Sequence, residues 1–319
     1  MAPGWDMSDP DVFTKPFQVT PTCHRDIYPF LSPENPQNAQ QGKIVVVIGG
    51  GDGIGAAAAK VWARAGAEGV VLVARRVETL EKVASEIQAE NGEVQVVVAP
   101  ADVTDGRAVQ GVFDKVHSAF GRAADVMLNV AGYSAENEMI GDTDVEDWWK
   151  SWTINLKGSY AAIHHFIQSQ KDPKAPTGTV VLVSGNRAGL TEPGHSAYNI
   201  SKLAQQRLVE HVHAEYPTLR AFTTTPGIVL TKMITPAFAK YAVDHPDLLG
   251  ALTLYLAQPR ADYLRGDYVS VNWDMEELET RYRDDIVAKK LLKTSWLPVM
   301  PVGGGSGLGN CLAVDQTSA

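Results

Sequence analysis

Tyr198 and Lys202 stand four residues apart in the run Tyr198-Asn-Ile-Ser-Lys202, and a glycine-rich loop, Gly49-x-x-x-Gly53-x-Gly55, lies far upstream of them. On a helix, residues with this spacing share one face, so the lysine ammonium can lie beside the tyrosine phenol. A neighbouring positive charge favours the phenolate and lowers the pKa of the tyrosine toward neutral pH. The bare amides of a glycine loop at the start of a helix can bind the phosphates of a dinucleotide. Together the two motifs predict hydride transfer, with Tyr198 transferring the proton.

The context of the glycine loop supports a phosphate-binding role. Residues 49–55 come directly after the continuous β-branched run of residues 44–48 and before residues 56–65, which are rich in helix formers. A loop in this place lies at the positive end of the helix dipole. A second glycine-rich run, residues 303–309, follows no buried strand and opens no helix, so we interpret it as part of a flexible tail.

Strands and helices alternate along the middle of the chain. Buried apolar runs predict further strands at residues 69–74, 94–99, 125–130, 179–183 and 220–225, with a seventh at 268–271. Helical patterns occupy residues 77–90, 106–120, 145–170 and 196–215. Strands separated by helices of this length form a parallel sheet that is covered on both faces. We therefore predict an α/β fold with a doubly wound parallel sheet, a single Rossmann-like domain over residues 43–272.

The two flanking segments differ in composition from this domain. Residues 1–42 contain many prolines and little periodicity, which indicates an extended N-terminal arm, with wrapping on the surface of the domain as one option. Residues 273–319 begin with a charged helix, expected over residues 275–292, and end in the Gly-rich tail. We expect both segments to lie outside the Rossmann-like domain.

Four further motifs stand in a fixed order along the predicted strands and helices. Asp102-Val103 comes after the third strand, Asn129-Val-Ala-Gly132 closes the fourth, Asn155-Leu-Lys-Gly lies in the long helix, and Pro226-Gly-Ile-Val-Leu-Thr231 follows the sixth strand. With the glycine loop and the Tyr–Lys pair, this series resembles the short-chain dehydrogenase/reductase family over residues 43–272. The arm and the tail are similar to those of fungal members, which are often linked to secondary metabolism.

The resemblance implies a bound nicotinamide dinucleotide. In that family the aspartate after the third strand contacts the adenine, and the segment after the sixth strand closes over the nicotinamide. The motifs and the resemblance together predict the cofactor-binding residues Gly49, Gly51, Asp52, Gly53, Ile54, Gly55, Arg75, Arg76, Asp102, Val103, Asn129, Ala131, Tyr198, Lys202, Pro226, Gly227, Val229 and Thr231.

The residues at the end of the second strand indicate whether the cofactor is NAD(H) or NADP(H). A carboxylate there would bind the ribose 2′-hydroxyl of NAD(H), whereas basic side chains accept the 2′-phosphate of NADP(H). The chain has Arg75 and Arg76 at this place and no carboxylate, and a guanidinium suits bidentate phosphate contact. The resemblance places Asp52, the residue before the second glycine of the motif, near the adenosine ribose, where its carboxylate would instead repel a 2′-phosphate. Two arginines outweigh one carboxylate, so we predict NADP(H).

The resemblance also assigns catalytic roles. Tyr198 matches the family's acid/base, Lys202 matches the lysine that lowers the phenol's pKa and binds the nicotinamide ribose, and Asn155 matches the residue that holds a water in the proton relay. The family usually has a serine that polarises the substrate oxygen, thirteen residues before the tyrosine. In this chain Gly185 stands thirteen residues before Tyr198, so that serine is missing. A missing donor of this kind costs about 3–4 kcal/mol of transition-state stabilisation.

Two neighbours of Gly185 are candidates to replace the serine. Ser184 is the first, although alternate residues of a strand point to opposite faces, so it needs a local bulge or shift to reach the site. Asn186 is the other candidate.

We therefore predict an oxidoreductase that transfers hydride between NADP(H) and a carbonyl or secondary alcohol. Residues 231–256 occupy the family's substrate lid, and their apolar content suggests a small, fairly hydrophobic substrate, although a buried helix explains the same residues. Because Gly185 replaces the serine, two alternatives stay open. One is a lyase, isomerase or cyclase with the same fold, and the other is a non-catalytic protein that senses NADP(H).

Composition excludes several partner classes. The 319 residues are 45% hydrophobic and carry a net charge of −9, which argues against nucleic-acid or anionic-membrane partners. Cys23 and Cys311 are the only cysteines, so we expect no disulfide and place the protein in the cytoplasm. The pairs His164–His165 and His211-x-His213 lack a chelating spacing, so we expect no metal site. The resemblance implies a homodimer or homotetramer.

Overall fold

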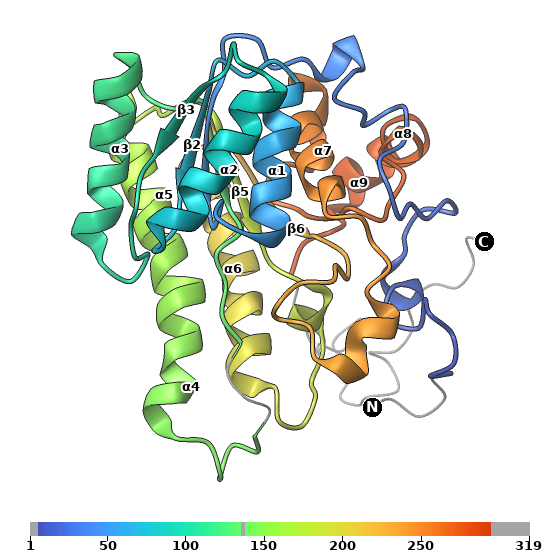
Figure 1. The fold of residues 1–319 in the computed structure, drawn as a ribbon. Coiled ribbons are helices and arrows are strands. Elements are labelled where there is room, and N and C mark those ends of the chain that lie inside the picture. The colour runs from blue at the N-terminus through green and yellow to red at the C-terminus, as the bar shows by residue number, and fades with distance from the viewer. Residues whose placement is uncertain (1–5, 135–137, 295–319) are drawn as a thin grey trace, which may run out of the picture.

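A parallel sheet forms the centre of the protein (Figure 1). The computed structural model describes residues 6–134 and 138–294. The sheet has seven strands in the order β3-β2-β1-β4-β5-β6-β7, all of them parallel. The strands are β1 (Ile44–Ile48), β2 (Gly69–Val73), β3 (Gln95–Val98), β4 (Val126–Asn129), β5 (Thr179–Val183), β6 (Arg220–Thr225) and β7 (Tyr268–Ser270). This arrangement confirms the predicted doubly wound fold and the seventh strand.

Helices follow the strands on both faces of the sheet. They are α1 (Gly53–Arg64), α2 (Val77–Glu90), α3 (Gly106–Phe120), α4 (Val145–Trp152), α5 (Gly158–Ser169), α6 (Ser196–Glu215), α7 (Asp247–Leu256), α8 (Met275–Glu277) and α9 (Arg283–Lys289). Short 3₁₀ turns are η1 (Lys15–Phe17), η2 (Pro36–Asn38), η4 (Asn186–Gly189), η5 (Pro236–Tyr241) and η6 (Pro259–Leu264), and η3 (Thr153–Lys157) and η7 (Leu278–Tyr282) are π turns.

Strands β1, β2, β4 and β5 are buried at every residue because their alternate side chains enter two separate cores. In β1, Val45 and Val47 belong to the core under α1, α2 and α7. Ile44, Val46 and Ile48 belong to the opposite core, under α3, α5 and α6. A continuous β-branched run therefore has an apolar environment at every residue, which is why the sequence pattern predicted these strands well.

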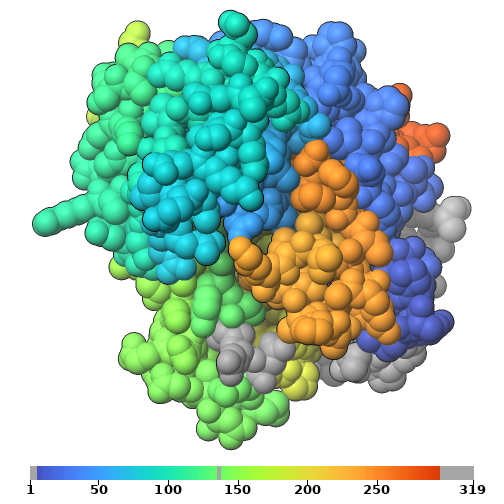
Figure 2. Space-filling view, in the orientation of Figure 1, coloured from blue at the N-terminus to red at the C-terminus, as the bar shows by residue number. Residues whose placement is uncertain are grey.

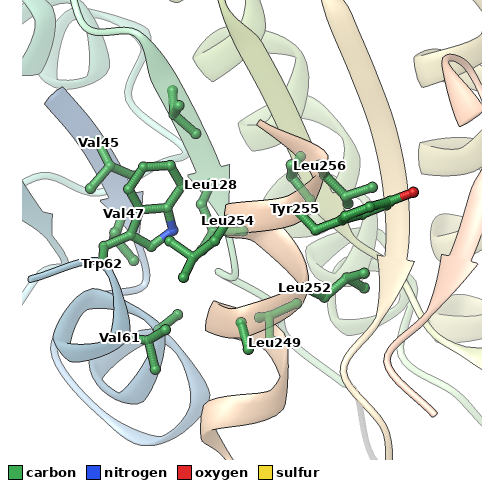
Figure 3. Close-up of a cluster of buried hydrophobic side chains, with 14 of the residues drawn as sticks. Val45, Val47, Val61, Trp62, Leu128, Leu249, Leu252, Leu254, Tyr255 and Leu256 are labelled. Carbon is green, nitrogen blue, oxygen red and sulfur yellow. The ribbon is translucent and has the colours of Figure 1, made fainter. Parts of the chain in front are cut away.

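Helix α7 packs tightly against α1 in the first of these cores. Figure 3 shows Trp62 of α1 and Leu254 of α7 in one apolar cluster. The Trp62 indole Nε1 donates to Thr253 Oγ1 at 2.9 Å, and a Cβ added to Gly250 would lie 2.7 Å from Val61 Cβ. Residues Leu248–Leu256 are all buried. The apolar content of this part of the predicted lid therefore reflects a core helix, as the alternative interpretation stated.

The single helix predicted for residues 145–170 consists of α4, the π turn η3 and α5. Asn155 lies in this turn, where its main-chain oxygen accepts hydrogen bonds from the Ser159 hydroxyl at 2.5 Å and from Gln205 Nε2 at 2.8 Å. Periodicity alone does not reveal a π turn, because the apolar pattern continues on both sides of it.

The segments outside the central domain pack against it where they are described. The arm forms an isolated bridge from Cys23 to Trp273 and includes η1 and η2. The predicted charged helix of residues 275–292 is divided into α8, η7 and α9, and ends at Lys289. The Gly-rich tail lies outside the described residues. None of the described helices has both the length and the apolar content that a membrane span requires.

Candidate active site

The loop between β1 and α1 has the close-packed backbone of a phosphate-binding loop. Gly49 has a φ of +90°, and a Cβ on it would lie 2.8 Å from the Ala131 nitrogen. A Cβ on Gly55 would lie 2.2 Å from the Gly49 oxygen, so the first turn of α1 can approach the loop only because this residue is glycine. The amides of Ile54 and Gly55 have no acceptor within the described part of the chain, as expected at a helix N-terminus. These free amides and the helix dipole fit a dinucleotide pyrophosphate.

Charged side chains surround Asp52, the N-cap of α1. The Asp52 carboxylate pairs with Lys232, from the segment after β6, and lies 3.6 Å from Arg76 Nη2. The Lys232 ammonium holds the pKa of Asp52 below its usual range. Sequence reasoning missed Lys232, because its partner lies in a loop far away along the chain and no motif marks it.

Arg75, which precedes α2, is exposed and acts on a different carboxylate, Asp102. Its charge helps to hold the pKa of Asp102 below the usual range, after the larger effect of the hydrogen bonds that Asp102 Oδ1 accepts from the Thr104 amide and hydroxyl. The structure thus brings the predicted Arg75 close to Asp102, and Arg76 close to Asp52. Two positive charges near Asp52 leave this end of the site positive overall.

Tyr198 and Lys202 lie together on α6, as their spacing predicts. Lys202 Nζ is 5.6 Å from the centroid of the Tyr198 ring and donates to the Val183 oxygen at the end of β5, at 2.8 Å. A Cβ on Gly132 would lie 3.4 Å from Lys202 Nζ and 3.7 Å from Asn155 Oδ1, so these two side chains converge beside the end of β4. The carboxyl edge of the sheet therefore brings Tyr198, Lys202 and Asn155 together.

Burial governs the charges of this pair. It lowers the pKa of Lys202 to about 7 and raises the pKa of Tyr198, while the Arg187 guanidinium has a smaller, lowering effect on the Tyr198 pKa. The sequence predicted a lowered tyrosine pKa caused by Lys202. The structure differs because burial disfavours both charged forms, and this effect outweighs the support that the Lys202 ammonium would give the phenolate.

Asn155 is fully buried and uses most of its polar atoms within the protein. Its Nδ2 donates to the Tyr133 oxygen at 2.8 Å and to Ser201 Oγ at 2.9 Å, and its Oδ1 accepts from the Tyr133 nitrogen at 2.8 Å. Its main-chain oxygen already accepts two hydrogen bonds, from Ser159 and Gln205. Among the described residues Oδ1 thus accepts one hydrogen bond, and its second lone pair is free to accept another.

Gly185 leaves open space beside the Tyr198 hydroxyl. A Cβ on Gly185 would have Tyr198 Oη at 3.9 Å and no other atom of the described residues within 4 Å. The φ of Gly185 is 173°, which is extended backbone open to any residue. Glycine is therefore required here neither by conformation nor by packing, and a larger side chain would point toward Tyr198.

The two candidate replacements for the serine are engaged elsewhere. The Ser184 hydroxyl donates to the main-chain oxygen of Lys202 at 3.0 Å and is buried between β5 and α6. Asn186 Nδ2 donates to the Phe13 oxygen at 3.4 Å, and its Oδ1 accepts from the Tyr268 hydroxyl. The bulge or shift that Ser184 needs is not found, so its hydroxyl is turned away from the Tyr198 hydroxyl.

Other predicted residues lie at the same edge of the sheet in supporting places. Asn129 is buried, donates to Ser159 Oγ at 2.9 Å and accepts from the Ala131 nitrogen at 3.1 Å, so it stabilises the turn after β4. Val103 packs against Gly158. The segment after β6 carries the remaining predicted residues: Pro226, Gly227, Val229, which is buried, and Thr231, whose methyl faces Gly53. No cluster of metal-binding side chains occurs in the parts of the chain that the structure covers.

Comparisons with known proteins agree with this geometry. The sequence profile of the short chain dehydrogenase family matches residues 43–242. Short chain dehydrogenase mpl6 of Monascus purpureus is 33% identical over 276 residues, which cover 84% of this chain and 93% of that protein. The structure of a short chain dehydrogenase from Salmonella enterica subsp. enterica serovar Typhi has a TM-score of 0.67 at 26% identity and covers 74% of this chain and 98% of that one. A structure from Shigella flexneri 2a, complexed with NADP, has a TM-score of 0.66 at 24% identity and covers 74% of this chain and 99% of that one.

The parallel sheet and the glycine loop at its carboxyl edge define a Rossmann-like dinucleotide-binding protein. More specifically, the chain belongs to the short-chain dehydrogenase/reductase family and is similar to its fungal members. Proteins of this family are generally oxidoreductases that bind NAD(H) or NADP(H).

Proposed function

We propose that the protein is an NADP(H)-dependent oxidoreductase that interconverts a carbonyl and a secondary alcohol, with Tyr198 as the acid/base. The observation that carries this proposal is the position of the Tyr198 hydroxyl, which has no side chain beside it at Gly185 and lies at the edge of the sheet where Lys202 and the glycine loop also lie. A carbonyl oxygen beside Gly185 would lie within reach of the phenol proton.

The charges of the site favour carbonyl reduction. A proton donor must hold its proton at working pH, and burial raises the pKa of Tyr198. In this proposal Lys202, held by the Val183 oxygen, returns a proton to the phenol through a water molecule, and Asn155 Oδ1 holds that water by accepting a hydrogen bond from it. When bound, NADPH would supply the hydride.

We infer the preference for NADP(H) from the charges near α1 and α2. Asp52 was the residue that argued against a 2′-phosphate, and its carboxylate is paired with Lys232 and Arg76. The remaining positive charge and exposed Arg75 suit a dianionic phosphate. These contacts support NADP(H) over NAD(H).

An assay of the full-length protein tests the proposal. Oxidation of NADPH and of NADH is followed at 340 nm against a panel of apolar ketones, and the products are identified. We expect ketone-dependent oxidation, with kcat/KM for NADPH at least about tenfold above that for NADH, the effect of one charge-assisted hydrogen bond. Equal values for the two cofactors would contradict the cofactor preference.

The same assay separates the two alternative functions, which the absent serine keeps open. Product formation without net NADPH oxidation would identify a lyase, isomerase or cyclase. Tight NADPH binding without turnover of any compound would identify a sensor. Neither result is compatible with the proposed redox reaction.

Restoring the missing hydroxyl should increase activity. Gly185→Ser places a hydroxyl beside Tyr198 in space that is open, without backbone strain. We expect kcat/KM for small ketones to rise at least about tenfold, a cautious lower bound beside the hundred- to thousandfold effect of a well-placed oxyanion donor. Gly185→Ala fills the same space without a donor and is the matched control. Equal effects of the two variants would show that the substrate oxygen does not lie beside residue 185.

We further propose that the protein is a homo-oligomer formed through α4, α5 and α6. Trp149, Tyr160 and Ile200 are 52%, 57% and 43% exposed on these helices, and an open cavity of about 490 Å³ lies on the same face. A second copy of the chain would remove this apolar surface from water. Light scattering of the purified protein is expected to give a multiple of 34.4 kDa, and a monomer at micromolar concentration would refute the proposal.

A further inference from the structure

The N-terminal arm lies against the part of the chain that follows β6. In Figures 1 and 2 the dark-blue arm runs beside the orange segment that contains η5 and α7. Tyr241 Oη donates to the Met7 oxygen at 2.8 Å, and the His245 amide donates to the Arg25 oxygen at 2.8 Å. Trp273 Nε1 donates to the Phe17 oxygen at 2.7 Å. These contacts, spread along the arm, fix its path over the domain.

A buried ion pair anchors the arm next to the loop after β6. The side chain of Asp244 has no exposed surface, and its Oδ1 accepts from Arg25 Nη1 at 2.9 Å. Asp244 Oδ2 accepts from the Ile228 amide at 2.5 Å, in the loop predicted to cover the nicotinamide. Arg25 also donates to Thr14 Oγ1 at 3.0 Å, which ties the preceding turn of the arm to the same anchor. The pair thus holds Thr14 and its neighbour Phe13 in a defined place.

Phe13 is part of an aromatic cluster with the substrate-lid turn η5. Its ring centroid is 4.7 Å from that of Phe238 and 4.9 Å from that of Tyr241, the latter in an edge-to-face arrangement. Such pairs stabilise the contact beyond the burial of their apolar surface. The cluster joins the arm to the lid, although Phe13 and Phe238 stand far apart in the sequence.

The same cluster reaches the residues beside Tyr198. Asn186, which donates to the Phe13 oxygen, directly follows Gly185, the residue that faces the Tyr198 hydroxyl. The Arg187 guanidinium lies over the Phe238 ring at 5.4 Å, and its charge acts on Tyr198. Two separate sets of contacts therefore connect Phe13 to the space in which the substrate would react.

We propose that the N-terminal arm is a working part of the active site, in which Phe13 forms an apolar wall of the substrate space and selects ketones that carry an aromatic or branched apolar group. The inference rests on the proposed carbonyl reduction. It gives a segment outside the Rossmann-like domain a role in substrate choice, and it makes Phe13 a specificity-determining residue. The role of Arg25 is positioning, because it acts through Asp244 and the path of the arm.

The test compares Phe13→Ala and Phe13→Leu with Phe17→Ala in the full chain. Phe17 is a phenylalanine of the same arm that lies outside the aromatic cluster, so it is the matched control. For each variant, kcat and KM are measured separately with acetophenone-like ketones and with small aliphatic ketones, and the Kd for NADPH is measured by fluorescence. Phe13→Leu keeps most of the apolar volume and guards against misfolding of the alanine variant.

We expect Phe13→Ala to raise KM for aromatic ketones about tenfold, the scale of apolar contacts in a specificity pocket, with little change in kcat. KM for small aliphatic ketones and the Kd for NADPH should stay within about twofold of the values of the unchanged protein, because neither ligand is expected to contact Phe13. Phe13→Leu should lie between Phe13→Ala and the unchanged protein. An equal loss for all ketones, or a loss no larger than that of Phe17→Ala, would overturn the proposal.

A binding measurement separates failure of this inference from failure of the proposed function. In the Tyr198→Phe background with NADPH bound, ketone binding is followed through the cofactor fluorescence, which needs no turnover. If adding Phe13→Ala lowers the affinity for aromatic ketones selectively, Phe13 contacts the substrate, even if the protein catalyses a reaction other than carbonyl reduction. Unchanged affinities for both ketone classes would refute this contact, whatever reaction the protein performs.

Discussion

Replacing Tyr198 with phenylalanine is expected to lower kcat for carbonyl reduction at least about a hundredfold, because it removes the group that delivers the proton in the transition state. The change should be local. Tyr198 Oη has no hydrogen-bond partner among the described residues, so its loss leaves no buried group unpaired. The aromatic ring that stands 5.6 Å from Lys202 Nζ remains in place. NADPH affinity and the thermal midpoint are therefore expected to stay close to those of the unchanged protein.

The measurement is steady-state kinetics with the best ketone of the panel, together with NADPH titration and thermal unfolding. Tyr216→Phe, at the C-terminal end of the same helix, is the matched control and should retain full activity. A Tyr198→Phe variant that keeps more than about a tenth of the original kcat would remove this tyrosine from the role of general acid. Loss of activity with a parallel loss of folding would be attributed to structure, which is why unfolding is measured beside kcat.

The sequence predicted most of the fold because its strongest signals are local. A strand such as Ile44–Ile48 is apolar at every residue, since both of its faces enter a core, and this pattern does not depend on distant contacts. Tyr198 and Lys202 lie on one helix, so their spacing already predicted that they meet. The motifs at the strand ends converge because all seven strands are parallel. Motifs that follow one another along the chain therefore lie together at one edge of the sheet.

The features that sequence reasoning missed depend on contacts between distant segments. Lys232 neutralises Asp52 although no spacing links them, and this pairing removes the main argument against a 2′-phosphate. The direction of the Ser184 hydroxyl depends on how β5 lies against α6. The lowered pKa of Lys202 is a consequence of burial, which a helix-spacing argument does not include. In each case the sequence identified the residue or its region, and the three-dimensional surroundings determined its state.

The N-terminal arm illustrates the same limit. Its prolines predicted an extended segment, with wrapping on the surface as one option, but they gave no sign of where it would be held. The arm is tied to the domain through Arg25, whose partner Asp244 lies in the segment between η5 and α7. Neither residue belongs to a recognisable motif. Because the pair is buried at Asp244 and close to the loop after β6, its loss should affect both folding and the site.

Arg25→Met is expected to lower the free energy of unfolding by about 3 kcal/mol, since removing one partner of a buried ion pair leaves the other charge uncompensated. The value lies at the lower end of the usual range because Asp244 keeps its hydrogen bonds from Asn272 Nδ2 at 2.7 Å and from the Ile228 amide at 2.5 Å. Urea titration measures the effect. Lys60→Met is the matched control, because it breaks the partly exposed pair with Glu86 at 2.6 Å and should cost less than about 1 kcal/mol.

A double-mutant cycle assigns the cost of Arg25→Met to the pair itself. Asp244→Asn removes the negative charge and keeps the shape of the side chain, so Arg25→Met should cost less in this background than in the unchanged protein. We expect a coupling energy of about 1–3 kcal/mol, the range for residues in direct contact. A coupling near zero would mean that Arg25 stabilises the protein through its pair with Asp11, its hydrogen bond to Thr14 or the packing of its aliphatic chain, and not through Asp244. In that case the arm would be held by the aromatic cluster of Phe13 and by its hydrogen bonds to Tyr241 and Trp273.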